Sequence, residues 1–230
     1  MPYHLRRLES PKMSDGFAEM IHRANAFFTE LRANNTKDFY EAHKATYNSE
    51  IKKPAELLAD LFAEDLAKIT GKAHKPKVFR IHRDVRFSKD KTPYKTHLHM
   101  MWSNPSQAKT PVFFFGASPD YVLLGMGIMG MEKDSLTAFR NMVDRRGNDL
   151  TDAIDASGAV ISDWGPEPLK RVPKPFDQDH PHADLLKRKA FALRAELPAG
   201  WDDKGLLKSL GTLVPSLMPT WRILDDTFPG

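Results

Sequence analysis

Residues 79–87, FRIHRDVRF, carry the pattern that decides the fold class. Every second residue is apolar except Arg83, and charged or polar residues stand between them. A period of two is typical of a β-strand, in which successive side chains point to opposite faces. We therefore expect a strand here with one largely apolar face, on which Arg83 would form a buried pair or a cap. The opposite face would carry Arg80, His82, Asp84 and Arg86.

Further strands are expected directly after this one. A turn over residues 89–93 leads to a strand of roughly residues 95–102, and two more candidates cover residues 111–116 and 121–129. The connections between these runs are short. Short connections favour antiparallel pairing, because parallel strands need long crossovers. The middle third of the chain is thus predicted to be an antiparallel meander of about four or more strands.

The segments on either side of this meander follow helical spacing. Before it, helices are expected from Ser14 or Asp15 to Asn34-Asn35, then around residues 39–47, and over residues 51–66, where Pro54 must start a helix or kink one. After it, helices are expected around residues 136–143, 150–156, 185–197 and 204–213, with a last turn or helix from Pro219. Helices, a meander and more helices indicate the α+β class. We expect residues 14–230 to form one domain and residues 1–13 to be a flexible extension.

Composition excludes several classes of protein. The chain is 41% hydrophobic and 28% charged, as is usual for globular proteins. No apolar run approaches the ~20 residues that a membrane helix needs. Without cysteine there is no disulfide, thiolate nucleophile or iron–sulfur cluster. The N-terminal stretch has no apolar region of the kind that a secretory signal needs. We expect a cytoplasmic protein with no membrane partner and no cofactor.

Positive charge is concentrated in residues 72–97, where nine Lys and Arg face two Asp, although the whole chain carries only +4. A basic segment on a mildly acidic body indicates a local anion site. Arginine forks match carboxylate or phosphate, and lysines supply mobile point charges. Asp84 or His82 would act as acid or base if this site is catalytic. The residues expected to bind a small anionic ligand are Arg80, Arg83, Arg86, Lys89, Lys91, Tyr94 and Lys95.

Two other classes of function stay open from the sequence. In one, which is less favoured, the basic segment contacts nucleic-acid phosphates while Tyr94 and Trp102 stack on bases. In the other, the segment is a structural module whose arginines form an internal ion-pair network. A concave site would favour the small ligand, an extended basic stripe the nucleic acid, and fully paired arginines the structural role.

Two further kinds of motif give only weak indications of a binding site. GMGIMG, residues 125–130, matches G-x-G-x-x-G in form, but the helix after it is not followed by the strand and acidic residue of a dinucleotide site. We expect these glycines to mark a bulge or close packing. The pairs His97/His99 and His180/His182 lack a spaced third ligand, so no metal site is expected.

A longer motif covers residues 83–95, RDVRFSKDKTPYK. It is accompanied by F-x-x-L-x-x-N-N at Phe28–Asn35, by a Gly-rich strand before Glu132 and by residues Asp179–Leu186. On these residues the sequence resembles a widespread bacterial and fungal family, one of the numbered domains of unknown function, whose hallmark is R-D-x-R-F-S-x-D-K-x-P-Y-K. The resemblance covers roughly residues 15–228, and Met131 stands where the family commonly has proline. It implies no particular activity.

Overall fold

One antiparallel sheet organises the part of the chain that the structure, a computed structural model, describes: residues 16–107 and 110–228. Six strands lie in the order β1-β2-β3-β4-β6-β5, and every neighbouring pair is antiparallel. The predicted α+β class and antiparallel meander are therefore confirmed. The expected extension over residues 1–13 lies outside the described residues, as do Ser14 and Asp15. The strands are β1 Lys75–Val78, β2 Leu98–Ser103, β3 Val112–Ser118, β4 Tyr121–Ile128, β5 Val160–Ile161 and β6 Phe191–Glu196.

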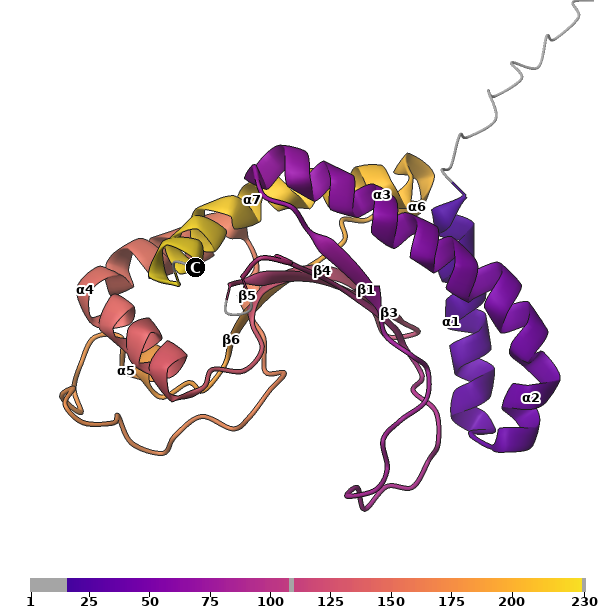
Figure 1. Cartoon of the computed structure of the whole chain (residues 1–230), viewed down its shortest axis with the longest axis horizontal. Coiled ribbons are helices and arrows are strands. Elements are labelled where there is room, and N and C mark those ends of the chain that lie inside the picture. Colours follow the sequence, from indigo (N-terminus) through magenta and orange to yellow (C-terminus); the bar gives the residue numbers. More distant parts are fainter. Residues whose placement is uncertain (1–15, 108–109, 229–230) are drawn as a thin grey trace, which may run out of the picture.

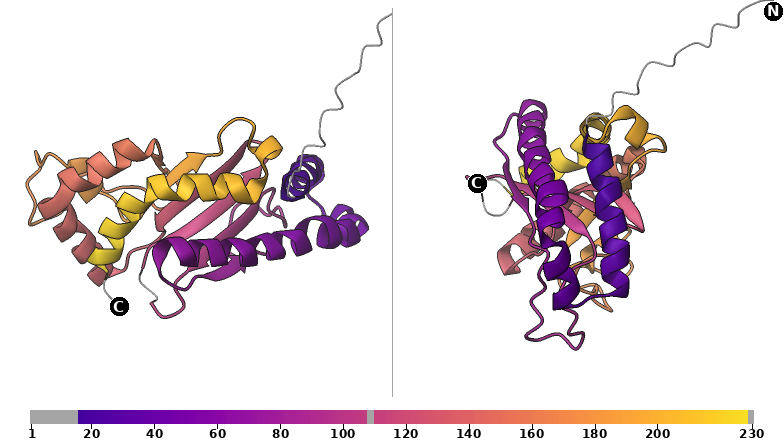
Figure 2. Two further views of the ribbon diagram at one scale, coloured as in Figure 1. Left: turned by 90° about the horizontal axis from the view of Figure 1, so that it is seen from above. Right: turned by 90° about the vertical axis from the view of Figure 1, so that its right-hand side faces the viewer.

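Helices cover one side of this sheet. Figure 1 shows the sheet as an arch with α1, α3 and α7 along its convex side, and seen from above α3 and α7 run across the strands (Figure 2). None of the described helices is long and apolar enough to cross a membrane. The helices are α1 Phe17–Ala33, α2 Lys37–Thr46, the π-helical η1 Tyr47–Lys52, α3 Lys53–Thr70, α4 Lys133–Ser157, α5 Ala183–Leu186, α6 Trp201–Lys204 and α7 Leu206–Thr227.

The main core lies between these helices and the sheet. Trp102 from β2 is fully buried there, packs edge-on against Phe62 of α3, and donates its indole N–H to the carbonyl oxygen of Ala59 at 2.8 Å. Pro54 stands in the first turn of α3, but η1 and α3 follow each other with no non-helical residue between them. The proline therefore lies inside a longer helical run, where the π-helix changes to α-helix, and does not start a separate helix. The helix then ends at Gly71, which adopts the left-handed conformation.

The strand predicted over residues 79–87 is wrong. Regular pairing ends with β1 at Val78, and the chain continues to β2 as an irregular ribbon with one isolated bridge, between His82 and Tyr94. The N–H of Arg83 donates to the oxygen of Pro93, but proline has no N–H to return the bond. The side chains are therefore not sorted onto two faces. Phe87, expected on the apolar face, is 96% exposed.

The helix predicted over residues 185–197 is also wrong. A short helix, α5, is followed by β6, although FALRAE in β6 is rich in helix formers. Pairing with β4 overrides this local preference. Two glycines of GMGIMG, in β4, let the backbone of β6 approach closely. A Cβ on Gly125 would lie 2.4 Å from the oxygen of Leu193, and one on Gly127 would lie 2.2 Å from the oxygen of Phe191. The prediction of close packing is confirmed for Gly125 and Gly127, whereas a Cβ on Gly130 would meet no described atom within 4 Å.

The helices near the C-terminus are longer than predicted. The two predicted over residues 136–143 and 150–156 form the single helix α4, which deviates from helical geometry at Arg146. Gly147 follows it, and the ring of His182 occupies the space that a Cβ there would need. The helix predicted around residues 204–213 continues through two prolines as α7 and includes the expected segment from Pro219.

Candidate functional site

The connection between β1 and β2, residues 79–97, is the cationic segment of the sequence, and we call it the signature loop. It descends on the open side of the arch, next to the turn between α1 and α2 (Figures 1 and 2). Its two branches are tied by backbone hydrogen bonds from Lys95 to Ile81 at 2.8 Å and from Arg83 to Pro93 at 2.9 Å. The loop is thus a distorted extension of the β1–β2 hairpin.

Asn35, in the turn between α1 and α2, holds the signature loop against the body. Its side-chain amide donates to the carbonyl oxygen of Tyr94 at 2.9 Å, and its side-chain oxygen accepts the N–H of Tyr94 at 3.1 Å. Tyr94 is only 5% exposed and its ring lies 4.5 Å from that of Tyr40 in α2. The motif ending at Asn35 and the motif ending at Lys95 therefore meet in space.

Several charges of the signature loop pair with one another. Arg83 donates to Asp90 and to the hydroxyl of Thr92, so it forms a pair, but this pair lies at the surface and is not buried as expected. Hydrogen bonds from Thr92 and then from Arg83 lower the pKa of Asp90 to about 2. Arg86 makes a bidentate pair with Asp84, at 2.6 and 2.9 Å, and thereby lowers the pKa of that carboxyl. These contacts stabilise the loop. Part of the segment therefore has the internal ion pairs that the structural alternative predicts.

Among the cations that lack an acidic partner in the described part of the chain, three lie close together: Lys77, Arg80 and Lys95. They gather around Phe79, with the ammonium nitrogens of Lys77 and Lys95 at 5.0 and 5.6 Å from the centre of its ring. The Lys95 ammonium donates to the carbonyl oxygen of Arg80 at 3.0 Å. Burial, and after it the charges of Arg80 and Lys77, lowers the pKa of Lys95. Positive charge is therefore left uncompensated here.

A surface pocket of about 430 Å³, which we call the basic pocket, opens beside Lys95. Arg32, at the end of α1, contributes to its wall and is held in a bidentate pair with Asp120 at 2.6 and 3.2 Å. The side chain of Arg83 is 26% exposed. The described residues that line this pocket include Arg32, Asn35, Arg83, Asp90, Lys95 and His97.

The structure divides the expected site residues into three groups. Arg83, Tyr94 and Lys95 line the basic pocket. Arg80 and His82 line a separate pocket of about 330 Å³, bordered by Tyr40 and Tyr47. The remaining four line neither of these pockets and are exposed toward the tip of the loop: Asp84, Arg86, Lys89 and Lys91. The single polar face expected for Arg80, His82, Asp84 and Arg86 is wrong, because the segment is not a regular strand.

Six described residues of the basic pocket are not among the site residues expected from the sequence: Arg32, Asn35, Asp90, Thr92, Thr96 and His97. Asn35 was visible as the last residue of F-x-x-L-x-x-N-N, but only as a helix end. Arg32 lies in the same motif, one turn earlier. His97 was considered only as part of a metal pair. Their place in the F-x-x-L-x-x-N-N motif could suggest Asn35 and Arg32. The contact between the end of α1 and the signature loop is visible only in the structure.

His97 and His99 stack on each other, with ring centres 3.9 Å apart. His99 also stacks on Trp164 and shares a 2.9 Å hydrogen bond with the Tyr121 hydroxyl. Burial, with the neighbouring positive side chains second, lowers the pKa of His97 to about 4, and burial lowers that of His99 to about 3. Both are neutral at pH 7. The described residues contain no group of three or more His, Cys, Asp or Glu arranged to hold a metal.

The aromatic residues proposed for base stacking are not accessible. Trp102 is fully buried with its indole N–H bonded to the backbone, and Tyr94 is enclosed by Tyr40 and His82. That part of the nucleic-acid alternative is wrong, because both rings belong to the core. The exposed aromatic residue of the signature loop is Phe87, with the Arg86 guanidinium 5.9 Å from its ring centre.

Comparison with known proteins gives one match. No curated protein matches the sequence. The family model described as a conserved hypothetical protein (DUF2461) matches residues 23–221, a range that contains α1 from Arg23 onward, the signature loop and the whole basic pocket. This is a family of the kind that the resemblance of residues 83–95 and the accompanying motifs predicted. Because the match covers most of the chain, the chain belongs to the conserved hypothetical protein family DUF2461.

Proposed function

We propose that the basic pocket binds a small anionic ligand that bears phosphate or carboxylate. The observation that carries this proposal is Lys95, a residue of the pocket lining whose ammonium has Lys77 and Arg80 as its charged neighbours, with no carboxylate paired to any of the three among the described residues. Like charges held together without a counterion cost free energy. A bound anion would remove that cost.

The donors needed for such a ligand are present. An ammonium has three N–H donors, and Lys95 uses one of them on the oxygen of Arg80. Arg83 makes its bonds to Asp90 and Thr92 through Nη1 alone, so its Nε and Nη2 remain available. Because Asp90 and Thr92 fix one side of the guanidinium, little side-chain entropy is lost when the other side binds an anion.

The geometry supports binding more than catalysis. Asp84 and His82, the expected acid and base, do not line the basic pocket. Asp90 does line it, but its carboxylate already accepts bonds from Arg83 and Thr92, and the low pKa makes it a poor base at neutral pH. Charge attraction and hydrogen bonding are the chemistry that the described side chains offer.

Two lysines of the same motif allow a matched test. Lys95→Gln and Lys89→Gln remove the same charge, but only Lys95 lines the pocket. Thermal unfolding should be followed with pyrophosphate and with citrate, at constant ionic strength. An anion at a hundred times its dissociation constant should stabilise the wild type and Lys89→Gln by about 2.7 kcal/mol, and Lys95→Gln far less. Equal stabilisation of both variants would show general charge screening and would contradict the proposal.

A further inference from the structure

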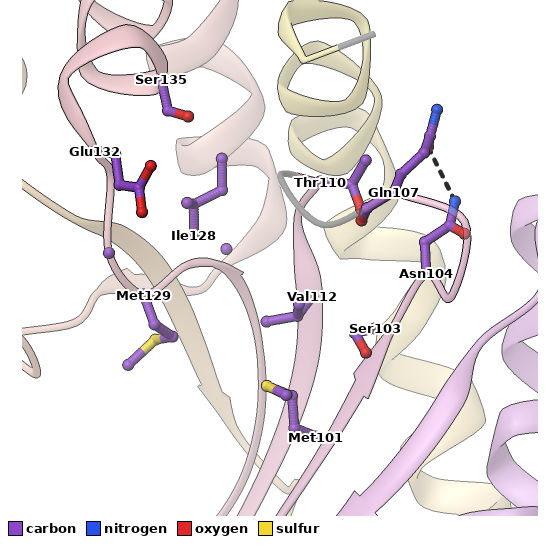
Figure 3. A pocket seen from close by; sticks show the side chains of 12 residues that line it. Met101, Ser103, Asn104, Gln107, Thr110, Val112, Ile128, Met129, Glu132 and Ser135 are labelled. Carbon is purple, nitrogen blue, oxygen red and sulfur yellow. Dashed lines mark hydrogen bonds between the residues drawn. The ribbon is translucent and has the colours of Figure 1, made fainter. Parts of the chain in front are cut away.

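A second cavity lies at the opposite end of β2 from the basic pocket and shares no residue with it. Its volume is about 460 Å³, within the usual range for small-molecule sites. Its apolar walls come from adjacent strands and the segment after β4, as Figure 3 shows, and we call it the methionine pocket. The apolar side chains that line it are Met101, Val112, Ile128 and Met129.

These walls suit a flat or apolar molecule. Methionine is flexible and polarizable, and its sulfur makes favourable contacts with aromatic rings. Gly127 and Gly130 add stretches of wall without side chains. Among the lining residues that the structure describes, which leave out residues 108–109, there is no lysine, arginine or histidine.

The start of α4 places two polar groups at this cavity. Ser135 is only 8% exposed, yet its hydroxyl makes no hydrogen bond within the described residues, and it points toward the cavity (Figure 3). Glu132, an exposed residue just before the helix, is the one ionisable side chain among the described lining residues, and its carboxylate likewise pairs with no described residue. A hydroxyl and a carboxylate without partners among the described residues leave hydrogen-bonding capacity for a ligand to use.

The charge of Glu132 decides which ligand fits. An anion would be repelled by this carboxylate, and a purely apolar molecule would remove water from it and from the Ser135 hydroxyl without replacing their hydrogen bonds. An ammonium group neutralises the carboxylate and supplies donors to both oxygens. We propose that the methionine pocket binds a small organic cation, in which an ammonium group is carried on an aromatic or apolar body. This site is independent of the basic pocket.

The probe for the test is 2-phenylethylammonium, titrated into the whole protein and followed by ¹H–¹⁵N NMR. Saturable shifts are expected around Met101, Val112 and Ser135. Glu132→Gln should weaken binding at least tenfold, and Ser135→Ala by roughly threefold. Asp134→Asn is the matched control, because it removes the same charge two residues further along, on an exposed residue outside the pocket, and it should leave the affinity unchanged.

A second comparison needs only the wild-type protein. The anion 3-phenylpropionate and the neutral 2-phenylethanol have the same ring, so both should bind at least tenfold more weakly than the ammonium if Glu132 selects the charge. Equal binding of all three molecules, an equal effect of Glu132→Gln and Asp134→Asn, or shifts confined to Lys95 and its neighbours would overturn the proposal.

Discussion

Replacing Asn35 by alanine tests whether this residue holds the signature loop to the body. The substitution removes both hydrogen bonds to the backbone of Tyr94, at 2.9 and 3.1 Å. Each is worth about 0.5–1.5 kcal/mol, and a buried partner left unsatisfied costs about 1–3 kcal/mol. Since Tyr94 is 5% exposed, water does not easily replace Asn35. We expect Asn35→Ala to lower the free energy of unfolding by roughly 2–4 kcal/mol in urea denaturation.

The neighbouring asparagine supplies the control. Asn34 is exposed and its side chain makes no hydrogen bond in the described structure, so Asn34→Ala should change stability by less than about 0.5 kcal/mol. Amide hydrogen exchange of Tyr94 should also rise in Asn35→Ala and not in Asn34→Ala. If the two variants unfold at the same urea concentration and protect Tyr94 equally, the assignment of Asn35 as the anchor is refuted.

Three further predictions address packing, exposure and pH. Gly125→Ala should lose about 1–3 kcal/mol of stability in urea unfolding, because its Cβ would lie 2.1 Å from the ring of Phe114, whereas Gly130→Ala meets no atom within 4 Å and should be nearly neutral. Phe87→Ser should shift stability by no more than about 0.5 kcal/mol, because the ring is 96% exposed; a loss of several kcal/mol would mean that the ring is packed. The pKa of His99 is lowered to about 3, so the unfolded state binds more protons below pH 6.5 and stability should fall as the pH drops from 6.5. At pH 5 this costs up to about 2 kcal/mol, and unfolding of His99→Gln measured at pH 7 and pH 5 should show a smaller loss than the wild type.

The sequence predicted the fold class because the hydrophobic period changes from helical to alternating where the structure changes from helices to strands. Short connections between residues 95 and 129 identified three paired strands, and the helical spacing on either side identified α1, α3 and α7. The two errors have a common cause, which is that local pattern and tertiary pairing disagree. Residues 79–87 alternate like a strand without a full partner, and β6 is composed like a helix but pairs with β4.

The candidate site was only partly predictable for a related reason. The alternating pattern predicted that Arg80 and Arg86 share one face of a strand. In the irregular ribbon, Arg80 instead lines the pocket bordered by Tyr40 and Tyr47, and Arg86 pairs with Asp84. The charge count identified the right segment. It could not identify Arg32, because a single arginine at the end of a helix is ordinary until the signature loop is placed beside it.

The central claim is that the basic pocket, and not the exposed tip of the signature loop, binds small anions. The most direct measurement is a ¹H–¹⁵N NMR titration of the wild type with pyrophosphate at constant ionic strength. The account predicts saturable shifts that follow one dissociation constant at Asn35, Lys95 and His97, with Lys89 and Lys91 little changed. Shifts that centre on Lys89 and Lys91, do not saturate and vanish when salt is added would contradict it, because exposed charges attract anions only through screened, non-specific interactions.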